Sequence, residues 1–147
     1  MNTRPWIDYY MDVANVVATR SSCLMKKVGA VAVKDRRIIA TGYNNPPSGY
    51  PHCKKCARKE QGIKPGENYD SCPSVHAELN VVTQAAKHGT SLKNAAVFCT
   101  HYPCPNCLKA MINSGITDIY VKQPLAISGI DSSLVKQLGE YVRIHEL

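Results

Sequence analysis

Two short motifs, each opening a predicted helix, constrain the fold of this chain more than any other feature. His76-Ala77-Glu78 opens a helical stretch that runs to His88, and Pro103-Cys104-Pro105-Asn106-Cys107 opens the next helix. A single β-rich run, 95–100, lies between them. Helices that alternate with strands in this way pack on a sheet. Both helix N-termini therefore lie at the same sheet edge, where we expect the histidine and the two cysteines to converge.

The residue types in these motifs indicate a catalytic zinc site. His76, Cys104 and Cys107 offer the nitrogen and thiolate ligands that zinc prefers, and three protein ligands leave the fourth position for water. The positive ends of the two helices help to keep the thiols ionised. Glu78 is not needed as a ligand, so its carboxylate can move a proton from water to a leaving group. His-x-Glu followed by Pro-Cys-x-x-Cys is the signature of zinc nucleobase deaminases, which predicts attack of water on C4 of a cytosine ring.

The rest of the sequence predicts an α/β protein. Apolar residues recur at helical spacing from Ile7 to Arg20, and two β-rich runs, 28–34 and 38–43, form a hairpin. Further segments are expected to be a strand at 116–121, a helix at 132–138 and a last strand at 141–144. This order predicts a single domain, 1–147, with a mixed sheet of about five strands and helices on both faces.

The long polar segment 44–74 needs something to hold it in place. The N-terminus has no secretory signal and no run is long enough to span a membrane, so we expect a cytoplasmic protein, in the host cytoplasm if viral. Spaced cysteines in that compartment are more often ligands than disulfides. Cys23, Cys53, Cys56 and Cys72 could form a structural zinc site that staples the loop; the alternative is four scattered thiols.

Several segments resemble the deoxycytidylate (dCMP) deaminases of bacteria, archaea and their viruses. The resemblance runs from the first helix to Val121 and rests on 20–24, 28–31, 41–49, 52–53, Cys72, 76–80 and 100–104. It implies the three-layer α/β/α cytidine deaminase-like fold and conversion of dCMP to dUMP for thymidylate synthesis. It also implies a homohexamer regulated by dCTP and dTTP, with Mg²⁺ accompanying these nucleotides.

The same resemblance assigns roles to single residues. His76, Cys104 and Cys107 match the zinc ligands of the family, Glu78 its proton shuttle, and Asn44 a position that contacts the deoxyribose. Some relatives replace part of the second cysteine set by histidine, so His52 is a substitute ligand there. Asn45 stands where the family usually has glycine, in a segment associated with effector binding, which leaves allosteric control open.

The 5′-phosphate of a nucleotide needs a cationic contact. The net charge is +7, and Arg20, Lys26 and Lys27 lie near the first strand, although each is equally well explained as a solvated charge. Tyr102 and Tyr120 at predicted strand ends could border the base or serve only in packing.

Two other functions fit part of this pattern. One is a zinc deaminase of another cytosine or adenine substrate, such as a nucleoside or a tRNA; the second is a zinc-containing nucleic-acid-binding module without catalysis. Glu78 discriminates against the module, because a purely structural site gains nothing from an uncoordinated carboxylate.

Overall fold

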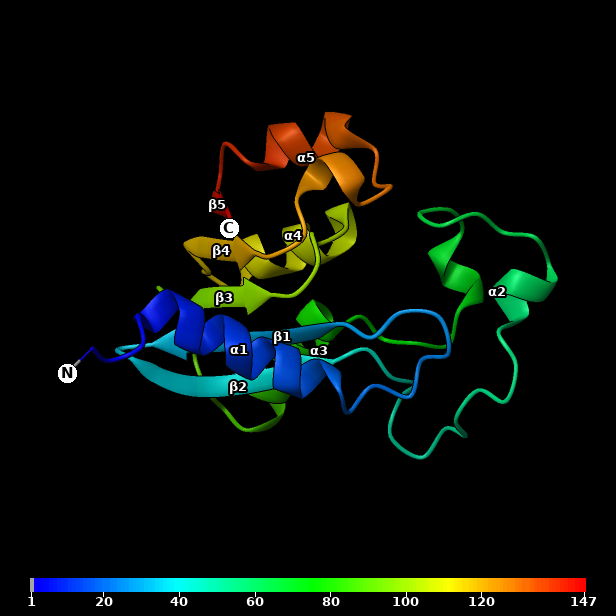
Figure 1. The fold of residues 1–147 in the computed structure, drawn as a ribbon, viewed down its shortest axis with the longest axis horizontal. Helices are drawn as coiled ribbons and strands as arrows, with labels where there is room; N and C mark the ends of the chain where they lie inside the picture. The colour runs from blue at the N-terminus through cyan, green and yellow to red at the C-terminus, as the bar shows by residue number, and fades with distance from the viewer. Residues whose placement is uncertain (1) are drawn as a thin grey trace.

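The computed structural model describes residues 2–147 and confirms the α/β fold with a mixed five-stranded sheet (Figure 1). The strand order is β2-β1-β3-β4-β5. The strand β1 pairs antiparallel with β2 and β3, whereas β3, β4 and β5 are parallel. The strands are β1 (Gly29–Lys34), β2 (Arg37–Tyr43), β3 (Ala96–Cys99), β4 (Asp118–Val121) and β5 (Arg143–Glu146).

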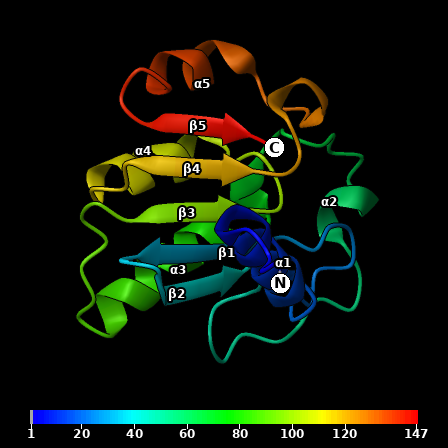
Figure 2. The ribbon, with the colours of Figure 1, turned by 60° about the vertical axis from the view of Figure 1, so that its left-hand side comes forward.

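Helices cover both faces of the sheet (Figure 2). The sheet alternates its side chains: Val31 and Val33 pack with α1, while Ala30 and Ala32 belong to the core that includes residues of α3, α4 and α5. The helices are α1 (Trp6–Ala18), α3 (Ala77–Lys87), α4 (Pro105–Asn113) and α5 (Ser132–Leu138). The three-layer arrangement that the family resemblance implies is therefore present.

Two glycines let helices approach the hairpin closely. A Cβ at Gly29 would lie 2.1 Å from the carbonyl oxygen of Ala14 in α1, and one at Gly42 would lie 2.2 Å from that of Ala77 in α3. No side chain fits at these distances. Gly42 thus sets the first turn of α3, the turn that carries the His-x-Glu motif, directly against β2.

The structure differs from the sequence-based expectation in three segments. The loop 44–74 contains a short helix, α2 (Ala57–Glu60), and a 3₁₀ turn, η1 (Tyr69–Ser71), and it extends past the ends of the strands (Figure 1). A second 3₁₀ turn, η2 (Leu125–Ile127), follows β4. The last strand begins at Arg143 and not at Tyr141, because the Tyr141 amide donates to the carbonyl of Leu138 in the turn that ends α5.

Within residues 2–147, no helix is both long enough and apolar enough to cross a membrane.

Candidate metal centre

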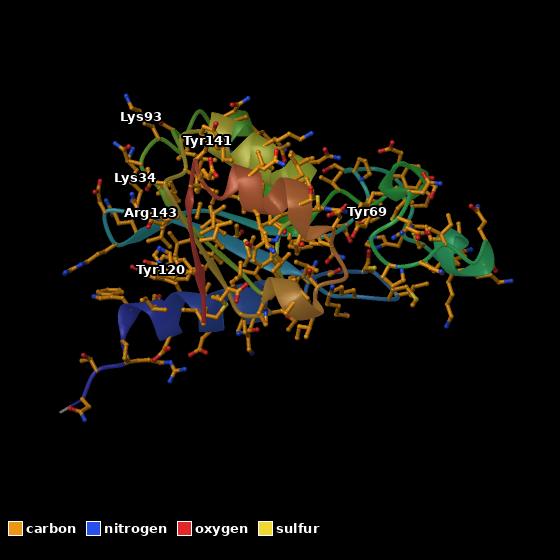
Figure 3. The ribbon with its side chains drawn as sticks, turned by 90° about the horizontal axis from the view of Figure 1, so that it is seen from above. Lys34, Tyr69, Lys93, Tyr120, Tyr141 and Arg143 are labelled. Carbon is orange, nitrogen blue, oxygen red and sulfur yellow. The ribbon has the colours of Figure 1, made fainter. Side chains whose placement is uncertain are left out.

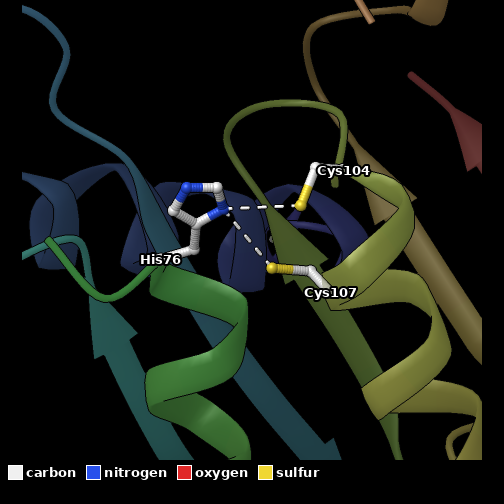
Figure 4. A group of neighbouring side chains, drawn as sticks. All are labelled: His76, Cys104 and Cys107. Carbon is white, nitrogen blue, oxygen red and sulfur yellow. Dashed lines mark hydrogen bonds between the residues drawn. The ribbon is translucent and has the colours of Figure 1, made fainter. Parts of the chain in front are cut away.

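The structure brings His76, Cys104 and Cys107 together between two helix N-termini (Figure 4). His76 is the N-cap of α3 and Cys104 the N-cap of α4, with Cys107 in the first turn of α4. The Nδ1 atom of His76 lies 3.5 Å from each sulfur. Neither N-cap side chain bonds to its own helix, as the usual capping residues do. Both side chains are therefore free to face each other.

Hydrogen bonds to the hairpin fix the start of α3. The side-chain amide of Asn80 donates to the carbonyl of Tyr43 at 2.8 Å, at the end of β2. Val75, directly before His76, forms a two-way backbone bridge with Asn45. The His76 backbone is thus tied to the sheet on both sides.

The pKa values of the two thiols shift in opposite directions. A hydrogen bond from Cys107, together with one from His76, lowers the pKa of the Cys104 thiol to about 4. The same bond and burial raise the pKa of the Cys107 thiol. One thiolate can therefore form unaided, whereas the second needs a positive charge beside it. A nitrogen and two sulfurs, all within 4.8 Å of one another, match the donor set of zinc.

Glu78 is buried in the first turn of α3, with 4% of its surface exposed. Burial raises the pKa of this carboxyl group to about 7. Its oxygens are not part of the three-atom group above, in agreement with a residue that is not a ligand. A carboxyl group with this pKa can both accept and release a proton near neutral pH.

His101 lies three residues before Cys104, and two lysines, Lys26 and Lys122, act on it. Burial lowers the pKa of His101 to about 4, and the positive charges of Lys26 and Lys122 contribute to this lowering. The Nδ1 atom of His101 lies 2.8 Å from the hydroxyl of Thr100, which itself accepts from the Gly29 amide. Lys122 was not predicted from the sequence. The signal that could have identified Lys122 is its position directly after β4, next to the segment that leads into α4.

Asn44 and Asn45 hold the segment that carries Lys26. The side chain of Asn44 accepts from the Val28 amide at 2.8 Å and donates to the Lys26 carbonyl at 2.7 Å. The Oδ1 atom of Asn45 accepts from the amide and the hydroxyl of Ser22. The residue at the family's glycine position therefore makes contacts that glycine cannot make.

The tyrosines and the other cations predicted for substrate binding are not all at the centre. Tyr102 is half-buried against the core that holds the metal-ligand residues. Tyr120 points to the opposite face of the sheet, where it stacks on Phe98 and His145, because strand alternation gives its neighbours Ile119 and Val121 the α4 side. Tyr120 does not reach the centre, and Figure 3 shows it far from Tyr69, which contacts His76. Arg20 and Lys27 are exposed, and neither has a side-chain hydrogen bond within residues 2–147.

Tyr69 in the long loop is a second residue that the sequence analysis missed. Its ring packs edge-on against His76, with centroids 4.9 Å apart and planes at 88°. No periodic pattern marks a tyrosine in such a loop, so only its place seven residues before the histidine connects the two.

Four of the five other cysteines, Cys23, Cys53, Cys56 and Cys72, line one hollow of about 350 Å³ in the long loop and its neighbours. His52 and Arg58 also line it. Among the residues that the structure describes, the one group of three His, Cys or acidic ligand atoms within 4.8 Å of one another is the His76 group. Cys23, Cys53, Cys56 and Cys72 thus share a hollow, but no three of their sulfurs lie within 4.8 Å of one another. Cys99 is fully buried in β3, in agreement with a core residue.

Known proteins resemble the whole chain, and the resemblance includes the centre. The family model for the cytidine and deoxycytidylate deaminase zinc-binding region matches residues 4–123. ComE operon protein 2 of Bacillus subtilis is 34% identical over 143 residues, which are 97% of this chain and 72% of that protein. The deoxycytidylate deaminase of Mycobacterium phage D29 is 39% identical over 121 residues, 79% of this chain and 93% of the phage protein.

A solved structure shows the same fold. The dCMP deaminase from cyanophage S-TIM5, crystallised in complex with dCMP and dUMP, superposes with a TM-score of 0.80 at 30% identity. The match covers 99% of this chain and 100% of the cyanophage chain.

Proposed function

This chain belongs to the cytidine and deoxycytidylate deaminase family, and from that premise we propose that it hydrolyses dCMP to dUMP and ammonia. The observation that carries the proposal is the buried carboxyl group of Glu78 in the first turn of α3, two residues after His76 of the His76, Cys104 and Cys107 group. A structural zinc site has no use for that carboxyl group. The similarity to two phage dCMP deaminases, one of them crystallised with dCMP, supports this substrate.

In this proposal the three ligands and Glu78 divide the work. His76, Cys104 and Cys107 would hold zinc, which supplies Lewis-acid activation of water when bound. Glu78 would accept a proton from water and donate it to the ring nitrogen of cytosine. It would then take the second proton from the new hydroxyl group on C4 and deliver it to the amino group, which leaves as ammonia. A carboxyl pKa near neutrality allows both transfers without a large energetic cost.

Lys26 and Lys122 are our candidates for the 5′-phosphate of dCMP. They come from segments far apart in the sequence, and both act on His101, which stays neutral at pH 7. Two exposed cations beside a neutral imidazole suit a dianionic phosphate. Asn44 fixes the Lys26 backbone from one side and can still offer its second N–H and second lone pair to a sugar hydroxyl.

We also propose that Cys23, Cys53, Cys56 and Cys72 hold a second zinc, with His52 as a substitute ligand. The shared hollow supports this, and so do two buried donors without a partner in residues 2–147, Arg58 Nε and Ser74 Oγ. Thiolates are acceptors for such donors. A homohexamer of about 97 kDa from chains of 16.2 kDa, and control by dCTP and dTTP with Mg²⁺, stay predictions from the family resemblance.

The decisive experiment measures ammonia release from dCMP beside deoxycytidine, CMP and dCTP, with zinc per chain determined on the same sample. We expect turnover of dCMP, and we expect Glu78→Gln to keep zinc while losing at least about a hundredfold in kcat. Equal activity of the Gln variant would contradict the assigned proton transfer. Turnover of only another substrate would identify a different deaminase, and bound zinc without any turnover would favour the nucleic-acid-binding module.

A further inference from the structure

We propose that Tyr69 is a positioning residue for His76 and that Arg58 holds Tyr69 in place, so that the long loop acts on the metal centre. The inference rests on the proposed function for its kinetic part only. It concerns the contact between the rings of Tyr69 and His76 and the contact between Arg58 and Tyr69.

The His76 imidazole contacts the two cysteines and the ring of Tyr69. The Nδ1 atom faces both cysteines at 3.5 Å. A histidine that binds a metal almost always donates its other ring N–H to a carboxylate, a carbonyl or water, which fixes the ring orientation. In the part of the chain that the structure describes, no protein group is hydrogen-bonded to Nε2 of His76. The ring of Tyr69 packs edge-to-face with the imidazole, at 4.9 Å and 88°, a favourable geometry for aromatic pairs.

The second step is what holds Tyr69. Its ring is half-buried and packs against the main core cluster. The guanidinium of Arg58 lies over it, with Cζ 5.0 Å from the ring centroid. The same guanidinium donates to the backbone carbonyls of Lys64 and Glu67, the latter at a short distance. Arg58 therefore connects α2, the turn before η1 and the ring that contacts His76.

The third step joins this contact chain to the cysteine hollow. Arg58 follows Cys56 by two residues, and Tyr69 precedes Cys72 by three. Arg58 itself lines the hollow. A ligand or contact that fixes the conformation of the cysteine loop therefore also fixes the Arg58–Tyr69 pair. Through that pair it fixes the orientation of His76.

The test compares Tyr69→Leu, which removes the ring, with Tyr69→Phe, which keeps it. Tyr141→Leu is the matched control, because Tyr141 is 72% exposed and outside the site. We would measure kcat and KM for dCMP, the rate of zinc release to a colorimetric chelator, and the absorption spectrum after Co²⁺ substitution. The cobalt spectrum reports ligand geometry and needs no substrate.

We expect Tyr69→Leu to lower kcat about tenfold with a much smaller change in KM, to release zinc about tenfold faster, and to change the cobalt spectrum. Tyr69→Phe should restore most of each property. Arg58→Met should shift the same properties in the same direction by less, which keeps the test usable if Tyr69→Leu folds poorly.

Unchanged zinc release and an unchanged cobalt spectrum in Tyr69→Leu would overturn the proposal. A Phe variant as impaired as the Leu variant would also overturn it, since the hydroxyl and not the ring would then be the active element. If the wild-type protein deaminates nothing, the proposed function fails, while the two metal measurements still decide the role of Tyr69.

Discussion

The two cysteine-containing regions of this protein differ in how the fold supports them. His76, Cys104 and Cys107 begin helices that pack on the sheet, and their ligand atoms meet within 4.8 Å. Cys53, Cys56 and Cys72 lie in the long loop, and with Cys23 they line a hollow in which no three sulfurs lie within 4.8 Å of one another. The chemistry of the ligands is nearly the same in both regions. Helices anchored on the sheet thus bring their ligand atoms together before a metal binds, whereas the loop only places its cysteines around one hollow.

Removing one cysteine from each region tests this difference most strongly. We expect Cys104→Ser to lose the zinc of the preassembled centre and at least about a thousandfold in deaminase activity, because the centre supplies the activated water. Cys72→Ser should cost about tenfold in activity, because it acts only through the loop. Zinc per chain and kcat, measured on both variants, check the order of the two effects. Equal losses would show that the loop is as necessary for catalysis as the helix-borne ligands.

The close contact at Gly42 tests whether the sheet assembles the first region. We expect Gly42→Ala to destabilise the fold by about 3 kcal/mol, since its Cβ would lie 2.2 Å from the Ala77 carbonyl and push α3 away from β2. Gly139→Ala is the control, because its Cβ would meet nothing closer than 3.3 Å. Urea unfolding of both variants measures the cost. A Gly42→Ala variant as stable as the control would mean that α3 is placed by other contacts.

Lowering the pH should reduce the free energy of unfolding through His101, by less than the Gly42→Ala substitution does. The pKa of His101 is lowered to about 4 in the folded chain, mainly by burial, from about 6.5 in the unfolded chain. Between these values the unfolded state binds the extra proton, so stability falls as the pH decreases from 6.5 towards 4. The slope from this residue is at most about 1 kcal/mol per pH unit. Unfolding free energies of wild type and His101→Gln at pH 7 and pH 5 check it: the wild type should lose more, and equal losses would contradict the expectation.

Much of the metal centre follows from local patterns. The His-x-Glu and Pro-Cys-x-x-Cys motifs each begin a helix, and a single strand between them places both helix starts at one sheet edge. His76, Cys104 and Cys107 were therefore predictable as a group, and so was Glu78 as a carboxylate beside them that is not a ligand. The hairpin, the five strands and the main helices were predictable because their apolar residues recur at strand or helix spacing.

Contacts between distant segments were not predictable in this way. Strand alternation says that Tyr120 and Ile119 face opposite sides, but only the packing of α4 decides that Tyr120 is on the side away from the centre. The charges of Lys26 and Lys122 both act on His101, and the ring of Tyr69 contacts that of His76. The loops that bring these residues together have no periodic sequence pattern. The sequence by itself determined which residues carry the chemistry, because helix starts and ligand spacing are local properties. The tertiary structure alone decided which side chains surround them, because burial and contact depend on how the whole chain packs.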